Sequence, residues 1–294
     1  MSAMRTRQRR RGDEAGSLVL IGGACDPAGA ALGSFLDLSG ARDGAPLVVI
    51  TSASTDPVKA AEVWKRDLES AGATNVAAPI IDRRQRAQDA ECAELVRSSR
   101  GIFLGGGDQR KLVSTLGGSR VWRAVKEAFG NGATVCGTSA GAAALSETML
   151  SGGEVTSAGS AIPLHLGPGL GLLGFSSVID THFARRGRLQ RLIQQVARNP
   201  ELLGLGIDEN TGIVVRGHLA EVVGPGNVYY VDGRDAKFDN AVDVKAGSAA
   251  LTLSYLRVGV VGAGYTLDLR ERELDFLVDA NSPNGSRKNN TSLA

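Results

Sequence analysis

The feature that most constrains the fold is a repeated pairing of short apolar runs with amphipathic segments. Residues 18–21, 47–50, 101–104 and 133–136 are mainly apolar runs, and glycines or small polar residues follow them. Segments 57–71, 87–98 and 112–129 have helical spacing, the last with a break at Gly117-Gly118. Buried strands that alternate with helices are typical of a parallel sheet covered on both faces. The sequence therefore predicts an α/β fold with a mostly parallel sheet flanked by helices.

The pattern changes after about Gly206. Residues 212–217, 220–223, 228–231 and 251–261 have the character of short strands separated by Gly, Asn and Asp turns. They can extend the same sheet or form an antiparallel flap, so we expect a β-rich C-terminal third. A single domain is expected over residues 17–278. The tails, 1–16 and 281–294, are polar or arginine-rich, and we expect them to be disordered.

Composition excludes several classes of protein. The 294 residues are 43% hydrophobic, enough for a large core, and the net charge of +2 argues against bulk binding of nucleic acid. No apolar run approaches the roughly 18 residues of a membrane span, and no signal peptide is recognisable. The three cysteines have neither zinc-site nor disulfide spacing, so a cytoplasmic location without a metal or other cofactor is expected.

The sequence Gly137-Thr138-Ser139-Ala140-Gly141 matches the G-x-S-x-G pattern of a nucleophile elbow. An apolar strand candidate precedes it and an alanine-rich helix candidate follows it. A serine on such a tight turn projects its hydroxyl away from the backbone, and the N–H groups of the new helix can stabilise an oxyanion. We therefore predict that Ser139 is a nucleophile.

A nucleophilic serine needs a base, and the chain has three histidines, His165, His182 and His218. His182 follows the strand-like run 178–181, and catalytic groups gather at the carboxyl ends of parallel strands. His182 is the preferred base, and we expect it to meet Ser139 at one edge of the sheet.

The base in turn needs an orienting acid. Asp180 lies two residues before His182, whereas Asp208 and Glu209 follow another apolar run. Spacing does not choose among them, although an acid from a separate strand reaches the ring more readily, which weakly favours the pair Asp208-Glu209.

Two further groups of residues point to substrate binding. The glycines at 105–107 can present backbone N–H groups, so Gly106 and Gly107 are expected to complete an oxyanion hole with Ala140. Gln109 follows them as a candidate substrate ligand. Arginines just beyond His182 can pair with substrate carboxylates, at positions 185, 186, 188 and 191.

Together these motifs resemble the cyanophycinase family, over roughly residues 18–270. The blocks that carry the resemblance are Ile21-Gly22-Gly23, residues 105–109, 137–142, 180–183 with the arginines that follow, and 206–211. Their order and spacing are specific, although each block alone is weak. The resemblance implies a serine peptidase with a class I glutamine-amidotransferase-like fold, usually a homodimer.

The resemblance also implies which residues act. The family's catalytic serine, histidine and glutamate fall on Ser139, His182 and Glu209. The implied substrate pocket comprises Gln109, Asp180, Thr181, Arg186, Arg188 and Arg191. Position 181 is often Gln in the family, and the shorter threonine puts that substrate contact in question. The implied substrate is cyanophycin, a poly-aspartate that carries arginine on each β-carboxyl, and the product is the β-Asp-Arg dipeptide.

Three alternative functions remain beside this interpretation. An aspartyl or isoaspartyl dipeptidase of the same superfamily would use the same residues. An α/β-hydrolase esterase is disfavoured because its acid precedes its histidine, whereas Glu209 follows His182. A catalytically inactive binding module would not need all three of the candidate triad residues.

Overall fold

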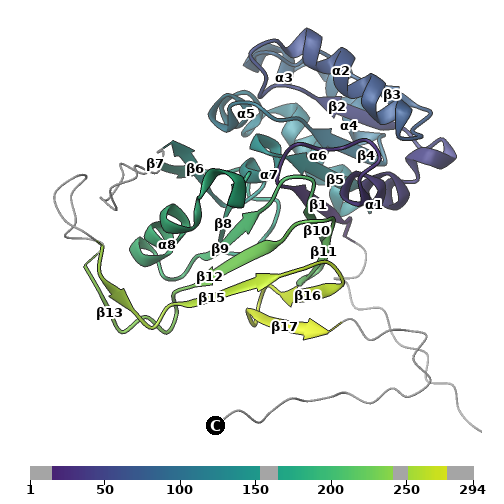
Figure 1. The fold of residues 1–294 in the computed structure, drawn as a ribbon. Coiled ribbons are helices and arrows are strands. Elements are labelled where there is room, and N and C mark those ends of the chain that lie inside the picture. The colour runs from purple at the N-terminus through teal and green to yellow at the C-terminus, as the bar shows by residue number, and fades with distance from the viewer. Residues whose placement is uncertain (1–14, 153–164, 241–250, 277–294) are drawn as a thin grey trace, which may run out of the picture.

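A computed structural model describes residues 15–152, 165–240 and 251–276. Among these residues the larger sheet has nine strands, in the order β17-β16-β11-β10-β1-β5-β4-β2-β3 (Figure 1). Its parallel strands are β1 (Leu18–Ile21), β5 (Thr134–Thr138), β4 (Gly101–Leu104), β2 (Leu47–Ile50) and β3 (Val76–Ala77). The antiparallel strands that extend it are β10 (Gly212–Arg216), β11 (Leu219–Val223), β16 (Tyr265–Asp268) and β17 (Glu273–Phe276).

A second sheet contains six strands within the described ranges, in the order β15-β12-β9-β8-β6-β7. They are β15 (Arg257–Val261), β12 (Val228–Asp232), β9 (Leu203–Ile207), β8 (Ser177–Thr181), β6 (Thr148–Gly152) and β7 (His165–Pro168). Strands β8 and β9 run parallel, as do β6 and β8. A small separate pair is formed by β13 (Phe238–Asp239) and β14 (Leu253–Ser254). The C-terminal third therefore both extends the first sheet and contributes to another.

Helices cover the two faces of the first sheet. One face carries α1 (Ala30–Ser39) and α2 (Pro57–Ser70), and the other carries α3 (Arg84–Ala87), α4 (Ala90–Arg97), α5 (Gln109–Leu116), α6 (Arg120–Gly130) and α7 (Ala140–Ala144). Helix α8 (Leu189–Arg198) packs on the second sheet. Short 3₁₀ turns occur at Ala41–Asp43 and Ala184–Arg186.

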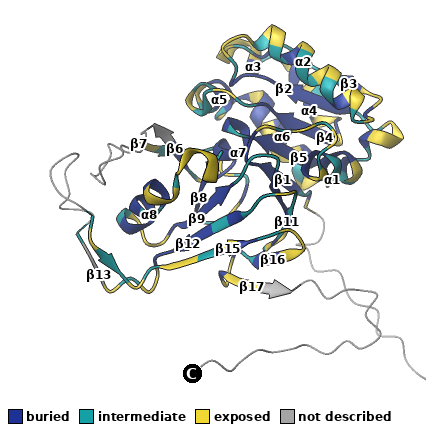
Figure 2. Ribbon diagram, viewed as in Figure 1, coloured by how far each residue is buried: buried dark blue, intermediate teal, exposed yellow. Residues whose placement is uncertain are grey.

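The core follows from the alternation of side chains along buried strands. Val19 of β1 packs with Phe35 of α1, whereas its neighbour Leu20 joins the cluster that contains α4 to α7. The same cluster includes Ile207 of β9, so the second sheet packs against the first on that side. Figure 2 shows the resulting buried centre, with exposed residues on the outer helices and along the lower strands.

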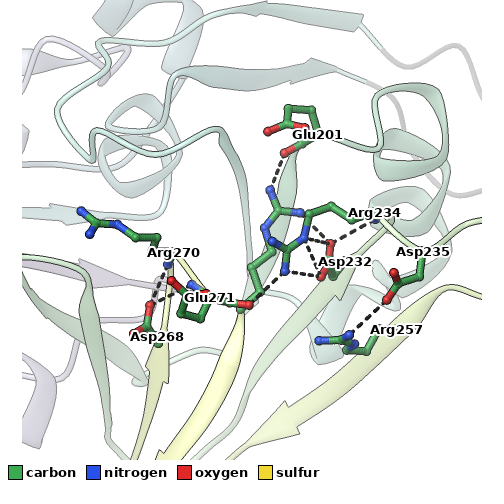
Figure 3. A network of polar contacts seen from close by, with 9 residues as sticks. Glu201, Asp232, Arg234, Asp235, Arg257, Asp268, Arg270 and Glu271 are labelled. Atoms are coloured by element: carbon green, nitrogen blue, oxygen red, sulfur yellow. Dashed lines mark hydrogen bonds and ion pairs between the residues drawn. The ribbon is translucent and has the colours of Figure 1, made fainter.

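A buried ion-pair network ties the two sheets together (Figure 3). Asp232, the last residue of β12, accepts hydrogen bonds from Arg234 and, at 2.6 Å, from Arg272 in the turn between β16 and β17. Arg272 also donates to the backbone carbonyl of Glu201. Burial opposes ionisation of Asp232, but the bonds from the two arginines outweigh it and hold its pKa below the usual value.

The α/β class and the parallel core are confirmed. The helix break is also confirmed, since α5 ends at Leu116 and α6 begins at Arg120. Strand β3 is only two residues long, because it lies at the edge of the sheet and Pro79 lacks an N–H for further pairing.

The expected disorder of residues 1–16 is wrong at its last position. Gly16 is buried and donates to the carbonyl of Phe129 at 2.7 Å. The remainder of the two tails, apart from Ala15, lies outside the described residues. The single-domain organisation stays a prediction. In the part of the chain that the structure describes, no helix has the length and apolarity to cross a membrane.

Candidate active site

Ser139 lies between the end of β5 and the first residue of α7, as the elbow pattern predicts. Its backbone has φ of 51° and ψ of −113°, a conformation that a non-glycine residue rarely adopts. Glycines make this turn possible: a Cβ on Gly141 would lie 2.2 Å from the carbonyl oxygen of Leu104. The strained turn directs the serine hydroxyl away from the sheet.

His182 immediately follows β8 and lies beside Ser139. Its backbone N–H donates to the backbone carbonyl of Gly22 at 2.7 Å, and its ring Nε2 lies 3.0 Å from the serine Oγ. Gly23 faces the imidazole so closely that a Cβ there would lie 2.3 Å from Cε1 of the ring. The turn after β1 therefore forms the surface against which the histidine packs.

The structure separates the three acids that spacing left open. Glu209 accepts a 2.7 Å hydrogen bond from Nδ1 of His182. Asp208 instead binds backbone, accepting from the N–H groups of Ala184 at 2.9 Å and Asn227 at 3.1 Å. Asp180 lies among arginines. Only Glu209 is thus placed to orient the imidazole, and a proton on Nδ1 leaves Nε2 free to accept from Ser139.

Glu209 is held in its ionised form. The hydrogen bond from His182 is the largest influence that lowers its pKa, and the hydrogen bond and charge of Arg185 lower it further, against the partial desolvation of the carboxyl. A charged carboxylate at this place stabilises an imidazolium on His182.

The glycine loop after β4 borders the serine. A Cβ on Gly106 would lie 3.4 Å from Cβ of Ser139, which places the backbone at close range. Gly107 has φ of 140°, and a Cβ there would lie 2.2 Å from the carbonyl oxygen of Ala53. Ala140 is the first residue of α7, so its N–H has no partner within the helix.

A cavity of about 330 Å³ opens beside Ser139 and His182. All six residues expected in the substrate pocket line it: Gln109, Asp180, Thr181, Arg186, Arg188 and Arg191. Thr181 is buried, and Gln109 donates to the backbone carbonyl of Leu150 at 2.6 Å. Arg186 is exposed and has no ion-pair partner among the residues described.

The carboxylate of Asp180 is fully engaged inside the protein. Arg191 binds both of its oxygens, and Arg188 donates to Oδ1 at 3.1 Å. Burial lowers the pKa of Arg188 to about 10; the charge of Asp180 opposes this shift, and Arg191 and Arg186 add to it. Arg188 thus remains cationic at neutral pH. With one carboxylate and three arginines, the cavity has an excess of positive charge.

One expectation about the site is wrong in detail: the candidate triad does not lie at the edge of one sheet. Ser139 follows a strand of the nine-stranded sheet, whereas His182 and Glu209 follow neighbouring parallel strands of the six-stranded sheet. The other histidines lie elsewhere, His165 exposed in β7 and His218 at 3.5 Å from Asp268.

Sequence reasoning named three further residues but missed their supporting roles. Gly23 supports the imidazole, Asp208 holds the turn after His182, and Arg185 donates to the second oxygen of Glu209 at 2.8 Å. The sequence signal that could have indicated the role of Gly23 is the block Ile21-Gly22-Gly23.

Within the described ranges, no group of three or more His, Cys, Asp or Glu side chains could hold a metal ion.

Comparison with known proteins identifies the family. The model of peptidase family S51 matches residues 18–223. The chain belongs to peptidase family S51. Similar curated proteins include the cyanophycinase of Trichormus variabilis, 32% identical over 260 residues that cover 87% of this chain and 86% of the relative. The cyanophycinase of Geminocystis herdmanii is 32% identical over 254 residues, covering 84% and 92% of the two chains.

Two solved structures share the fold of this chain. A peptidase from an acI-B1 actinobacterium has a TM-score of 0.64 at 22% identity and covers 87% of this chain and 98% of its own. A putative peptidase E protein of Listeria monocytogenes has a TM-score of 0.51 at 21% identity and covers 72% and 100%. The glutamine-amidotransferase-like fold is therefore confirmed, and the family indicates a peptidase.

Proposed function

We propose that this S51 peptidase is a serine-type cyanophycinase that releases β-Asp-Arg dipeptides from cyanophycin. The observation that carries the proposal is the continuous hydrogen-bonded chain from Ser139 through His182 to Glu209, beside a cavity rich in arginine. The cyanophycinases among the similar proteins support the choice of substrate.

In the proposed reaction, Oγ of Ser139 attacks an aspartyl carbonyl while Nε2 of His182 takes the hydroxyl proton. Glu209 holds the proton on Nδ1 and stabilises the imidazolium. The backbone N–H groups of Ala140, Gly106 and Gly107 bind the oxyanion. His182 then gives its proton to the leaving amine as the C–N bond breaks, and water hydrolyses the acyl ester.

The arginines are proposed to bind the carboxylate of the substrate. Arg186 has no ion-pair partner among the described residues and can take this role, and Arg188 and Arg191 lie at the cavity wall. Asp180, whose oxygens are already occupied, is proposed to position Arg188 and Arg191 rather than to bind a substrate guanidinium directly. Gln109 and Thr181 are proposed as further polar contacts.

The engagement of Asp180 keeps the aspartyl or isoaspartyl dipeptidase as a second candidate function. Asp180 is the one acid among the described residues of the cavity wall, and arginines already bind its oxygens. The cavity therefore favours a substrate that carries a carboxylate. Cyanophycin and an aspartyl dipeptide both carry one, so the cavity does not distinguish them. Incubation with cyanophycin and with Asp-X dipeptides in parallel separates the two, with products identified by mass.

The decisive variant is Ser139→Ala. It should abolish dipeptide release while the thermal unfolding temperature stays close to that of the wild type. Hydrolysis of insoluble cyanophycin by this variant at the wild-type rate would overturn the proposal.

Three other properties stay predictions: the homodimer, the cytoplasmic location and the single domain over 17–278. Measurement of the molecular mass in solution tests the first, cell fractionation the second and limited proteolysis the third.

A further inference from the structure

Glu209 has a second partner that the proposed reaction does not use. Its Oε1 accepts from His182 at 2.7 Å, and its Oε2 accepts from Nη1 of Arg185 at 2.8 Å. Each carboxylate oxygen thus has its own charged or polar donor. Rotation of the carboxylate about its terminal bond would break both hydrogen bonds together.

The backbone on both sides of Arg185 is fixed. The N–H of Ala184 donates to Asp208 at 2.9 Å, and the N–H of Arg186 donates to the carbonyl of His182 at 3.1 Å. Asp208 is the residue directly before Glu209. The turn that carries Arg185 is therefore attached to the same two segments that supply the imidazole and the carboxylate.

Arg185 does not take part in the cavity. Its side chain is 75% exposed, and it is absent from the described residues of the cavity wall, unlike Arg186. An ion pair this exposed contributes little to folding stability. Removal of this contact should therefore leave the folding stability nearly unchanged.

We propose that Arg185 is a positioning residue that orients the carboxylate of Glu209 so that Oε1 faces Nδ1 of His182. This inference rests on the proposed serine mechanism. The planar guanidinium suits the task because its N–H groups are directional. The positive charge also helps to keep the pKa of Glu209 low, after the larger effect of the bond from His182.

The first test measures how fast a fluorophosphonate probe labels Ser139, because this reaction needs an activated serine but no natural substrate. Oγ bonds to phosphorus, fluoride leaves, and His182 accepts the proton. The variant Arg185→Met should be labelled roughly three- to tenfold more slowly, and Arg185→Lys should recover part of the rate. The matched control is Arg66→Met, which removes a 71% exposed arginine that pairs with Asp67 at 3.1 Å, and it should label at the wild-type rate.

Substrate turnover and a double variant separate positioning from binding. Arg185→Met should lower kcat and leave KM unchanged, whereas Arg186→Met should raise KM. In a Glu209→Gln background, Arg185→Met should cause no further loss. Two results would overturn the inference. One is labelling of Arg185→Met at the wild-type rate. The other is a loss of turnover caused by Arg185→Met that is as large in the Glu209→Gln background as in the wild-type background.

A spectroscopic measurement keeps the inference testable if the wild type does not label and the proposed mechanism itself fails. The Nδ1 proton of His182, bonded to a carboxylate, should give a downfield proton resonance that disappears in Glu209→Gln. We expect Arg185→Met to shift or broaden this resonance and Arg66→Met to leave it unchanged. An identical resonance in Arg185→Met and in the wild type refutes the role of Arg185 without bearing on Ser139.

Discussion

Replacing Gly23 with alanine should disable the candidate site by displacing His182. The new Cβ would lie 2.3 Å from Cε1 and 2.4 Å from Nε2 of the imidazole, where ordinary contact begins at 3.4 Å. The ring must therefore move by about 1 Å, and Nε2 is the atom that faces the serine. A misplacement of that size in a catalytic group costs on the order of 100-fold in rate.

The assay compares kcat on cyanophycin and the rate of phosphonate labelling for Gly23→Ala and the wild type. Alanine at a φ of 106° also adds backbone strain of about 1–3 kcal/mol, so stability must be measured separately. Gly264→Ala is the matched control, because Gly264 has φ of 86° and a Cβ added to it would meet no atom within 4 Å. Its strain is similar but it touches no imidazole.

We expect both variants to lose comparable stability and only Gly23→Ala to lose activity. A folded Gly23→Ala protein with wild-type kcat would refute the argument that this glycine fixes the imidazole. An equal loss of activity in Gly264→Ala would attribute the effect to backbone strain instead.

Three further outcomes are expected. Glu209→Gln should lower kcat by up to about 10⁴-fold with little change in KM, because the amide no longer holds the proton on Nδ1 of His182. Asp180→Asn should destabilise the fold by about 3–5 kcal/mol in urea unfolding and raise KM, since it removes the buried carboxylate charge that pairs with Arg191. The pKa of Asp232 is lowered on folding, so its contribution to the free energy of unfolding is complete above pH 3.8 and decreases as pH falls through the lower folded value. Unfolding of Asp232→Asn measured between pH 5 and 2 should lack that decrease.

Local sequence was enough to predict the elbow and its neighbours. Ser139 is flanked by an apolar strand and an alanine-rich helix. The glycines at 137 and 141 have no side chain, so the backbone can make the tight turn that joins the strand to the helix. The same kind of reasoning located the break between α5 and α6. These features depend on interactions within a few residues, which a sequence shows directly.

The spacing of residues was not enough to predict the orienting acid, because the sequence places Asp208 and Glu209 side by side after the same strand. Successive side chains point in different directions, and only the packed turn after His182 decides which one reaches the imidazole. Asp208 binds the backbone of Ala184, and Glu209 is left to bind the ring.

The sequence by itself determined the α/β class and the nucleophile turn, because these follow from periodicity and local backbone preference. The set of polar residues around that turn came from the resemblance of the sequence motifs to a known family. The tertiary structure decided that Ser139 comes from one sheet and its two partners from another, and that Asp180 is neutralised by Arg191. Such pairings depend on which strand ends are packed together, and contacts between distant segments are set by the whole core rather than by neighbouring residues.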